Sequence, residues 1–80
     1  MTVRVLFFAY LRECCGVREV MMQLPADATV EDLWGRLLAR YERLPPTAPR
    51  FAVNRLYVDK EYRLHDNDEL ALIPPVSGGK

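Results

Sequence analysis

The residues with the most distinctive chemistry stand near the end of this 80-residue chain, where two glycines follow a pair of prolines. The segment comprises Pro74, Pro75, Val76, Ser77, Gly78, Gly79 and Lys80. Proline lacks a backbone donor and fixes φ, so a strand ends at the pair and the chain is directed away from the body. Glycine has no Cβ, so a narrow channel can close around it while a reagent reaches the carbonyl group. Five extended residues reach at most about 17 Å, enough to enter a partner's active site.

Other reactive side chains give weaker indications of a site. Cys14 and Cys15 are adjacent, a spacing that suits neither a disulfide nor a redox-active CxxC pair. His65 lies near Asp66 and Asp68, a combination more typical of a solvated turn than of a metal site. The sequence shows no Ser-His-Asp constellation and no glycine-rich phosphate loop. We therefore expect no bound cofactor or metal, and no catalysis by this chain alone.

Length and charge restrict the classes of function. Eighty residues are enough for one compact domain, and half of them are apolar, as in ordinary globular proteins. Lys and Arg together equal Asp and Glu, so no overall field attracts nucleic acid or an anionic membrane. The apolar stretch 3–10 is too short for a membrane span or a signal peptide, and unpaired cysteines fit a reducing compartment. We expect a cytoplasmic protein with no nucleic-acid or membrane partner.

Five short apolar segments predict the strands that must position the tail. They are residues 3–9, 17–24, 51–53, 56–58 and 69–73. Gly16 breaks the chain between the first two, which predicts a hairpin. Asn54 tolerates the left-handed conformation that a tight turn between the third and fourth strands requires.

A single helix is predicted between the two hairpins. Thr29 stands at its start with Asp32 three residues on, the arrangement of a capping box. One apolar stripe follows, made of Val30, Leu33, Trp34, Leu37, Leu38 and Tyr41. We expect this stripe, with Trp34 as a core anchor, to face the sheet. Three prolines within 44–50 end the helix and give a stiff surface loop.

This order of elements predicts an α+β domain of the β-grasp (ubiquitin-like) type. A mixed sheet would wrap round one main helix, with the last strand beside the first and parallel to it. Residues 1–75 would form the domain and 76–80 a flexible tail. A ferredoxin-type or cold-shock-like arrangement is harder to build, because the strong helix follows the first hairpin.

The first strand has apolar residues on both faces. Val3, Val5 and Phe7 alternate with Leu6, Phe8 and Tyr10, but one helix can cover only one face. The second face is either a partner surface or is covered by a loop or neighbouring strands, and the pattern favours neither. If a partner binds there, the balanced net charge predicts an apolar interface that salt affects little.

Four segments spread over the chain resemble the small-subunit family of molybdopterin synthase, sulfur carriers of the ubiquitin-like class. They are 5–13 (VLFFAYLRE) with Gly16, 52–54 (AVN), 64–70 (LHDNDEL) and 73–79 (IPPVSGG). The proline pair before Ser77 and the two glycines is the most specific part, because the related thiamine-pathway carriers usually lack those prolines. A Gly-Gly ending alone is weak evidence, since glycine and serine are common in frayed ends.

The resemblance implies a carrier cycle. A ubiquitin-activating-like enzyme would adenylate the terminal glycine, and a sulfurtransferase would convert it to a thiocarboxylate. The large synthase subunit, expected to form a heterotetramer with this chain, would receive the tail, and cyclic pyranopterin monophosphate would take the sulfur during molybdenum cofactor biosynthesis. Gly79 would carry the sulfur and Gly78 would give clearance. The implied partner contacts are Phe8, Pro74, Pro75, Val76 and Ser77.

Two departures from the family pattern keep alternatives open. Asn67 stands where the family turn usually has glycine, and asparagine also tolerates positive φ. Lys80 follows Gly79, so the lysine is trimmed, or was added in cloning, or the chain carries no sulfur. We favour the first two. The alternative functions are a sulfur carrier for thiamine or tRNA thiolation, a ubiquitin-like conjugated protein, and a non-carrier interaction module.

Overall fold

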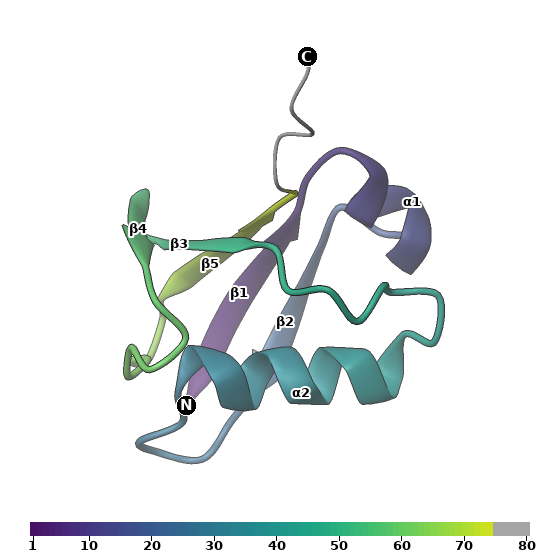
Figure 1. Cartoon of the computed structure of the whole chain (residues 1–80). Helices are drawn as coiled ribbons and strands as arrows, with labels where there is room; N and C mark the ends of the chain where they lie inside the picture. The colour runs from purple at the N-terminus through teal and green to yellow at the C-terminus, as the bar shows by residue number, and fades with distance from the viewer. Residues whose placement is uncertain (75–80) are drawn as a thin grey trace.

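Five strands form one mixed sheet, and the longer of two helices crosses one face of it in the computed structural model (Figure 1). The structure describes residues 1–74. The elements in chain order are β1 Thr2–Phe7, α1 Tyr10–Cys15, β2 Glu19–Gln23, α2 Val30–Arg40, β3 Arg50–Val53, β4 Leu56–Val58 and β5 Glu69–Ile73. The α+β, β-grasp architecture expected from the sequence is confirmed. No helix among the described residues is long and apolar enough to cross a membrane.

The sheet has the strand order β2-β1-β5-β3-β4, with the first and last strands of the chain at its centre. β1 and β5 run parallel, from the pair Arg4 and Glu69 to the pair Phe7 and Leu72. The other neighbouring strands are antiparallel. This confirms the predicted parallel pairing, and it brings the carboxyl ends of β1 and β5 together at one edge.

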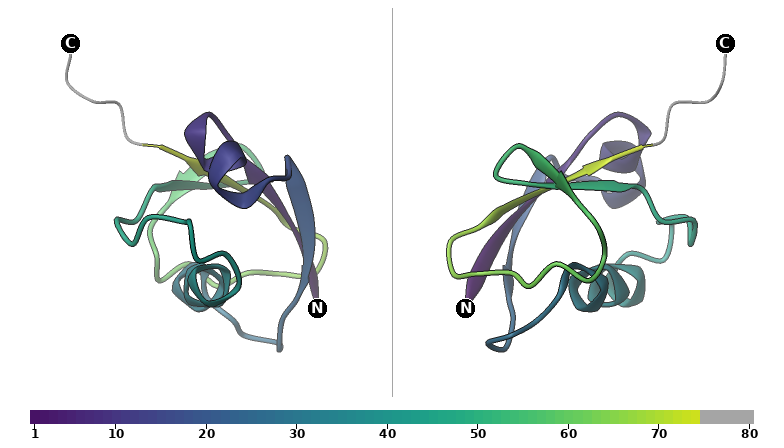
Figure 2. Two further views of the ribbon diagram at one scale, coloured as in Figure 1. Left: turned by 90° about the vertical axis from the view of Figure 1, so that its right-hand side faces the viewer. Right: turned by 60° about the vertical axis from the view of Figure 1, so that its left-hand side comes forward.

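The core lies between the sheet and α2, and it is built from alternate strand residues. Val3 and Val5 are fully buried, as are Leu70 and Leu72 from β5. Trp34 of α2 is only 8% exposed and packs edge-to-face on Phe51, with ring centroids 6.0 Å apart. Burying one such large apolar side chain stabilises the fold by about 2 kcal/mol. The prediction that the helical stripe faces the sheet is therefore confirmed, and Figure 2 shows α2 on only one side of the sheet.

A hydrogen-bonded network around Asp68 fixes the turn that leads into β5. The Asp68 carboxylate accepts from the Asn54 side chain at 2.9 Å and from the His65 backbone N–H at 2.7 Å. The Asn54 backbone N–H donates to the Glu69 carbonyl at 2.8 Å. Asn54 and Asn67 have φ of 50° and 70°, the left-handed conformation expected of each. The network ties the β3–β4 hairpin to the start of β5.

β1 and β2 pair antiparallel as predicted, but the connection between them contains a helix that the sequence did not predict. The chain forms the six-residue helix α1, in which Leu11 is buried and Gly16 ends the helix with φ of 76°. Tyr10 therefore begins a helix and does not extend the strand, which ends at Phe7. A helix this short contains fewer than two turns, so its apolar residues do not establish a 3.6-residue period.

Thr29 caps α2, and we expect its removal to destabilise the protein. Its hydroxyl oxygen accepts from the Asp32 N–H at 3.2 Å, and the Asp32 carboxylate accepts from the Thr29 N–H at 2.9 Å. Thr29→Ala leaves the Asp32 N–H without this partner and should lower the free energy of unfolding by about 1 kcal/mol in urea titration. The control Thr47→Ala, at an exposed loop position, should change it little. Equal stability of the two variants would contradict the capping role.

Candidate functional site

The sheet face opposite α2 carries an apolar hollow that follows from strand register. One row of cross-strand neighbours runs from Leu6 to Ala71, then to Ala52, then to Tyr57. Because the two central members of the row are alanines, the larger side chains at its ends enclose a hollow of about 390 Å³. We call this hollow the alanine groove; Phe8 and Ile73 also line it, as do the charged residues Arg55 and Glu69. It is an open surface with an apolar centre and charged residues in its lining, and it has room for a partner's side chain.

Phe8 connects the alanine groove to the point where the tail begins. Its side chain is 42% exposed, although the preceding Phe7 is buried. Its N–H donates to the Leu72 carbonyl at 3.3 Å, and its carbonyl accepts from the Leu11 N–H at 3.1 Å. These bonds hold Phe8 between α1 and the end of β5. Leu6 is partly covered by its neighbours, as one of the two interpretations expected, whereas Phe8 stays exposed.

Ala9 turns the chain sharply after Phe8. It has φ of 53° and ψ of −134°, a combination that a residue with a Cβ rarely adopts. Such a conformation costs about 1 to 3 kcal/mol and persists only where the surroundings impose it. Here the Ala9 carbonyl accepts from the Arg12 N–H at 3.1 Å, which starts α1. The strain therefore accompanies the placement of Phe8 and of the helix after it.

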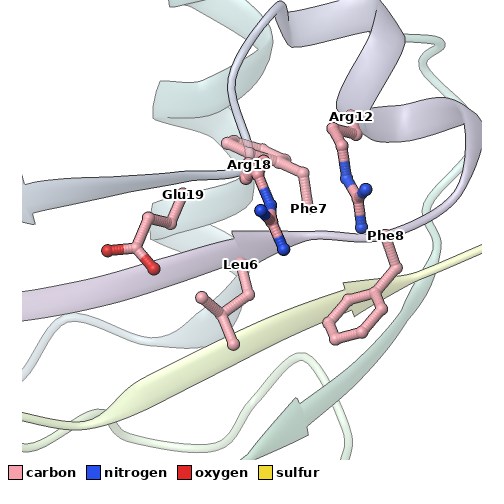
Figure 3. A pocket seen from close by; sticks show the side chains of 6 residues that line it. All are labelled: Leu6, Phe7, Phe8, Arg12, Arg18 and Glu19. Carbon is pink, nitrogen blue, oxygen red and sulfur yellow. The ribbon is translucent and has the colours of Figure 1, made fainter.

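A second hollow, of about 410 Å³, adjoins the first on the other side of Phe8. We call it the arginine hollow; it is lined by Leu6, Phe7, Phe8, Arg12, Arg18 and Glu19 (Figure 3). Arg12 comes from α1 and Arg18 from the segment before β2. Neither arginine is recognisable as a site residue from the sequence, because their proximity depends on α1, a helix that the sequence pattern does not predict.

Pro74 is the one of the two prolines before the expected tail that the structure describes. Pro74 is half-buried and directly follows β5, which ends at Ile73 as predicted. The other site residues predicted near this end lie outside the described residues: Pro75, Val76, Ser77, Gly78 and Gly79. Within the described chain, Phe8 and Pro74 are thus brought to the same edge of the sheet by the β1–β5 pairing.

The two cysteines and the histidine have structural and not catalytic surroundings in the described chain. Cys14 and Cys15 are half-buried and pack against the core. Burial raises the pKa of the Cys15 thiol, and the neighbouring Cys14 raises it further, so Cys15 is a weak nucleophile at neutral pH. His65 belongs to the Asp68 turn, and within residues 1–74 no group of three His, Cys, Asp or Glu side chains could hold a metal ion.

Comparison with known proteins finds similarity over almost the whole chain. Residues 5–79 match the model of the ThiS family. A molybdopterin synthase sulfur carrier subunit from Chlamydomonas reinhardtii is 43% identical, with 99% of this chain and 100% of the relative covered. A putative molybdopterin converting factor subunit 1 from Pyrococcus furiosus has a TM-score of 0.87 and 31% identity, covering 95% and 99%. A chain in a complex of subunits 1 and 2 of molybdopterin-converting factor from Helicobacter pylori matches with a TM-score of 0.70 and 26% identity. The match covers 99% of this chain and 100% of that chain.

Glycine at position 9 should relieve the strain described above. We expect Ala9→Gly to raise the free energy of unfolding by about 1 kcal/mol, because relief of the backbone strain exceeds the added entropy of the unfolded chain. The matched control is Ala39→Gly, at an exposed position inside α2, which should lower it by about 1 kcal/mol. Urea titration of both variants checks the opposite signs. A loss of stability in Ala9→Gly equal to that of the control would show that position 9 is unstrained.

Proposed function

Because this chain belongs to the ThiS family and to the sulfur carrier subunits of molybdopterin synthase, we propose that it carries sulfur on Gly79 for molybdopterin formation. The single observation that carries the proposal is the 43% identity to a relative of that name over the full length of both chains. The sequence of the tail supports it, since two glycines follow the proline pair. The chain would donate sulfur as one subunit of a sulfurtransferase.

Activation of the tail would proceed in two steps, adenylation and then sulfur transfer. Hydrolysis of the Gly79–Lys80 peptide bond must first free the Gly79 carboxylate. A ubiquitin-activating-like enzyme then joins this carboxylate to the α-phosphate of ATP and releases pyrophosphate, which creates a good leaving group. A sulfurtransferase then delivers sulfur at the oxidation level of sulfide, which attacks the acyl carbon, releases AMP and leaves a thiocarboxylate. This group is ionised at neutral pH and is more nucleophilic than a carboxylate. Gly78 provides clearance, because a residue without a Cβ fits a narrow channel.

Docking on the large synthase subunit would use the edge of the sheet where the tail begins. The Helicobacter pylori complex shows that a chain of this fold assembles with a subunit 2. In the present chain Phe8 is exposed and its N–H donates to the Leu72 carbonyl, two residues before Pro74, and the alanine groove lies next to Phe8. We infer that the body binds through Phe8 and Pro74 while Pro75, Val76 and Ser77 lead Gly79 into the active site. Two copies of each chain would form the heterotetramer.

The tail provides the direct test of this function. A chain ending at Gly79 should be adenylated and thiocarboxylated by the cognate activating enzyme, whereas the chain ending at Lys80 should not. The reason is that lysine displaces the carboxylate from the α-phosphate and places a side chain where glycine fits. The assay combines each chain with the enzyme, ATP and a sulfur donor and weighs the products by mass spectrometry.

A chain lacking both Gly78 and Gly79 is the control for this assay. It should fold normally but take up no sulfur, since the prolines separate the tail from the core. Equal loading of the Lys80 form with its lysine retained, or no loading of the Gly79 form, would instead favour a non-carrier interaction module.

Phe8 provides a separate test of docking. Phe8→Ala should weaken binding of the cognate large subunit about 10-fold or more, because an exposed aromatic at the centre of a contact is a typical anchor. Calorimetric titration measures the affinity. Met21→Ala is the matched control: Met21 is 55% exposed but lies on β2 beside Arg4, away from the tail edge. If both variants bind as tightly as the unmodified chain, Phe8 is not a contact.

A further inference from the structure

Two arginine side chains extend over the same side of the sheet as Leu6 and Phe8 (Figure 3). Arg12 lies in α1. The backbone N–H of Arg12 donates to the Ala9 carbonyl, and this hydrogen bond fixes the start of the helix. Arg18 is held by the Phe7 N–H, which donates to the Arg18 carbonyl at 2.9 Å just before β2 begins. Two separate backbone anchors thus bring both guanidinium groups to the arginine hollow.

Neither guanidinium group has a partner among residues 1–74. The described ion pairs of arginine and lysine join Arg4 to Glu69, Lys60 to Glu31 and Arg63 to Asp27. Arg50 and Arg40 lie over the rings of Tyr57 and Tyr41. Glu19 lines the arginine hollow but forms no ion pair with either cation in the described chain. The chain's zero net charge therefore conceals a local excess of positive charge beside Phe8.

We propose that Arg12 and Arg18 bind carboxylate side chains of the large subunit, next to the apolar contact made by Phe8. The inference rests on the proposed function, and it names the chemistry that the partner must present. A guanidinium group is planar and has five N–H donors. Two of them can bind one carboxylate in a bidentate pair, through two parallel N–H···O hydrogen bonds. Two guanidinium groups flanking an exposed aromatic ring therefore fit a surface in which acidic residues border an apolar pocket.

The surroundings favour a protein carboxylate over a phosphate. The two arginines share the hollow with the apolar side chains of Leu6 and Phe8, which a protein surface can cover but a free phosphate cannot. The Glu19 carboxylate lies at the same hollow and repels an anion of high charge density. Both arginines are exposed, so a partner reaches them without rearrangement of the fold.

This placement changes the expected effect of salt on the interface. The balanced net charge predicted an apolar contact that salt affects little. Cations at the edge of the contact instead accelerate encounter with an acidic surface, and ionic strength screens that effect. We expect association with the large subunit to slow as sodium chloride is raised, while the apolar contact at Phe8 persists.

The test measures binding of the cognate large subunit to Arg12→Gln, Arg18→Gln, the double variant and the unmodified chain. Each single change should weaken binding about 5-fold, and the double change about 20-fold or more, with the loss mainly in the salt-dependent association rate. Arg18→Lys keeps the charge and should retain the salt dependence. Arg43→Gln, an exposed arginine beyond α2, is the matched control and should bind like the unmodified chain. Urea titration of each variant confirms that it is folded.

Several results would overturn the proposal. If Phe8→Ala weakens binding while the double arginine variant binds normally, the proposed arginine contacts are refuted but the proposed function is not. If the chain ending at Gly79, without any other substitution, does not bind the large subunit, both proposals are refuted. Stronger competition by inorganic phosphate than by sodium chloride of equal ionic strength would identify a phosphate site instead. Weakened binding confined to the adenylating enzyme would assign the arginines to that enzyme.

Discussion

The parallel pairing of β1 with β5 is the constraint on which the candidate site depends. Because the two strands run in the same direction, both end at one edge of the sheet. Phe8 follows one strand and Pro74 follows the other, and the bond from the Phe8 N–H to the Leu72 carbonyl joins them. An antiparallel arrangement would place these residues at opposite edges. Phe8 and Pro74 thus lie at the same end of two neighbouring strands because of the sheet topology.

Much of this arrangement could be predicted from the sequence, because it depends on local signals and on one long periodic helix. The apolar stripe containing Trp34 predicted the helix, and the capping pair of Thr29 and Asp32 predicted where it begins. Asn54 and Asn67 indicated turns that need positive φ. Each of these signals lies within a few residues of the structure it determines. The parallel position of the last strand followed from the order of elements and the rules of sheet topology.

The parts that the sequence did not reveal depend on contacts between distant residues. The alanine groove exists because Ala52 lies opposite Ala71, and this register becomes visible only when β3 and β5 are paired. The arginine hollow needs α1, a helix too short to show a period. The strained backbone at Ala9 has no sequence signal, since alanine is an unlikely residue for that conformation. Such features are set by the assembled sheet.

The central position of β5 also has a consequence for how the protein is made. Arg4 contacts Glu69 across 65 positions of sequence, so the middle of the sheet closes only by joining the two ends of the domain. Folding dominated by such distant contacts is slow, because the loop must close before the contacts form. A chain emerging from the ribosome cannot complete its core until residue 73 has been released. Any chain interrupted before β5 would therefore lack both the completed core and the alanine groove, because Leu70, Ala71 and Leu72 belong to β5.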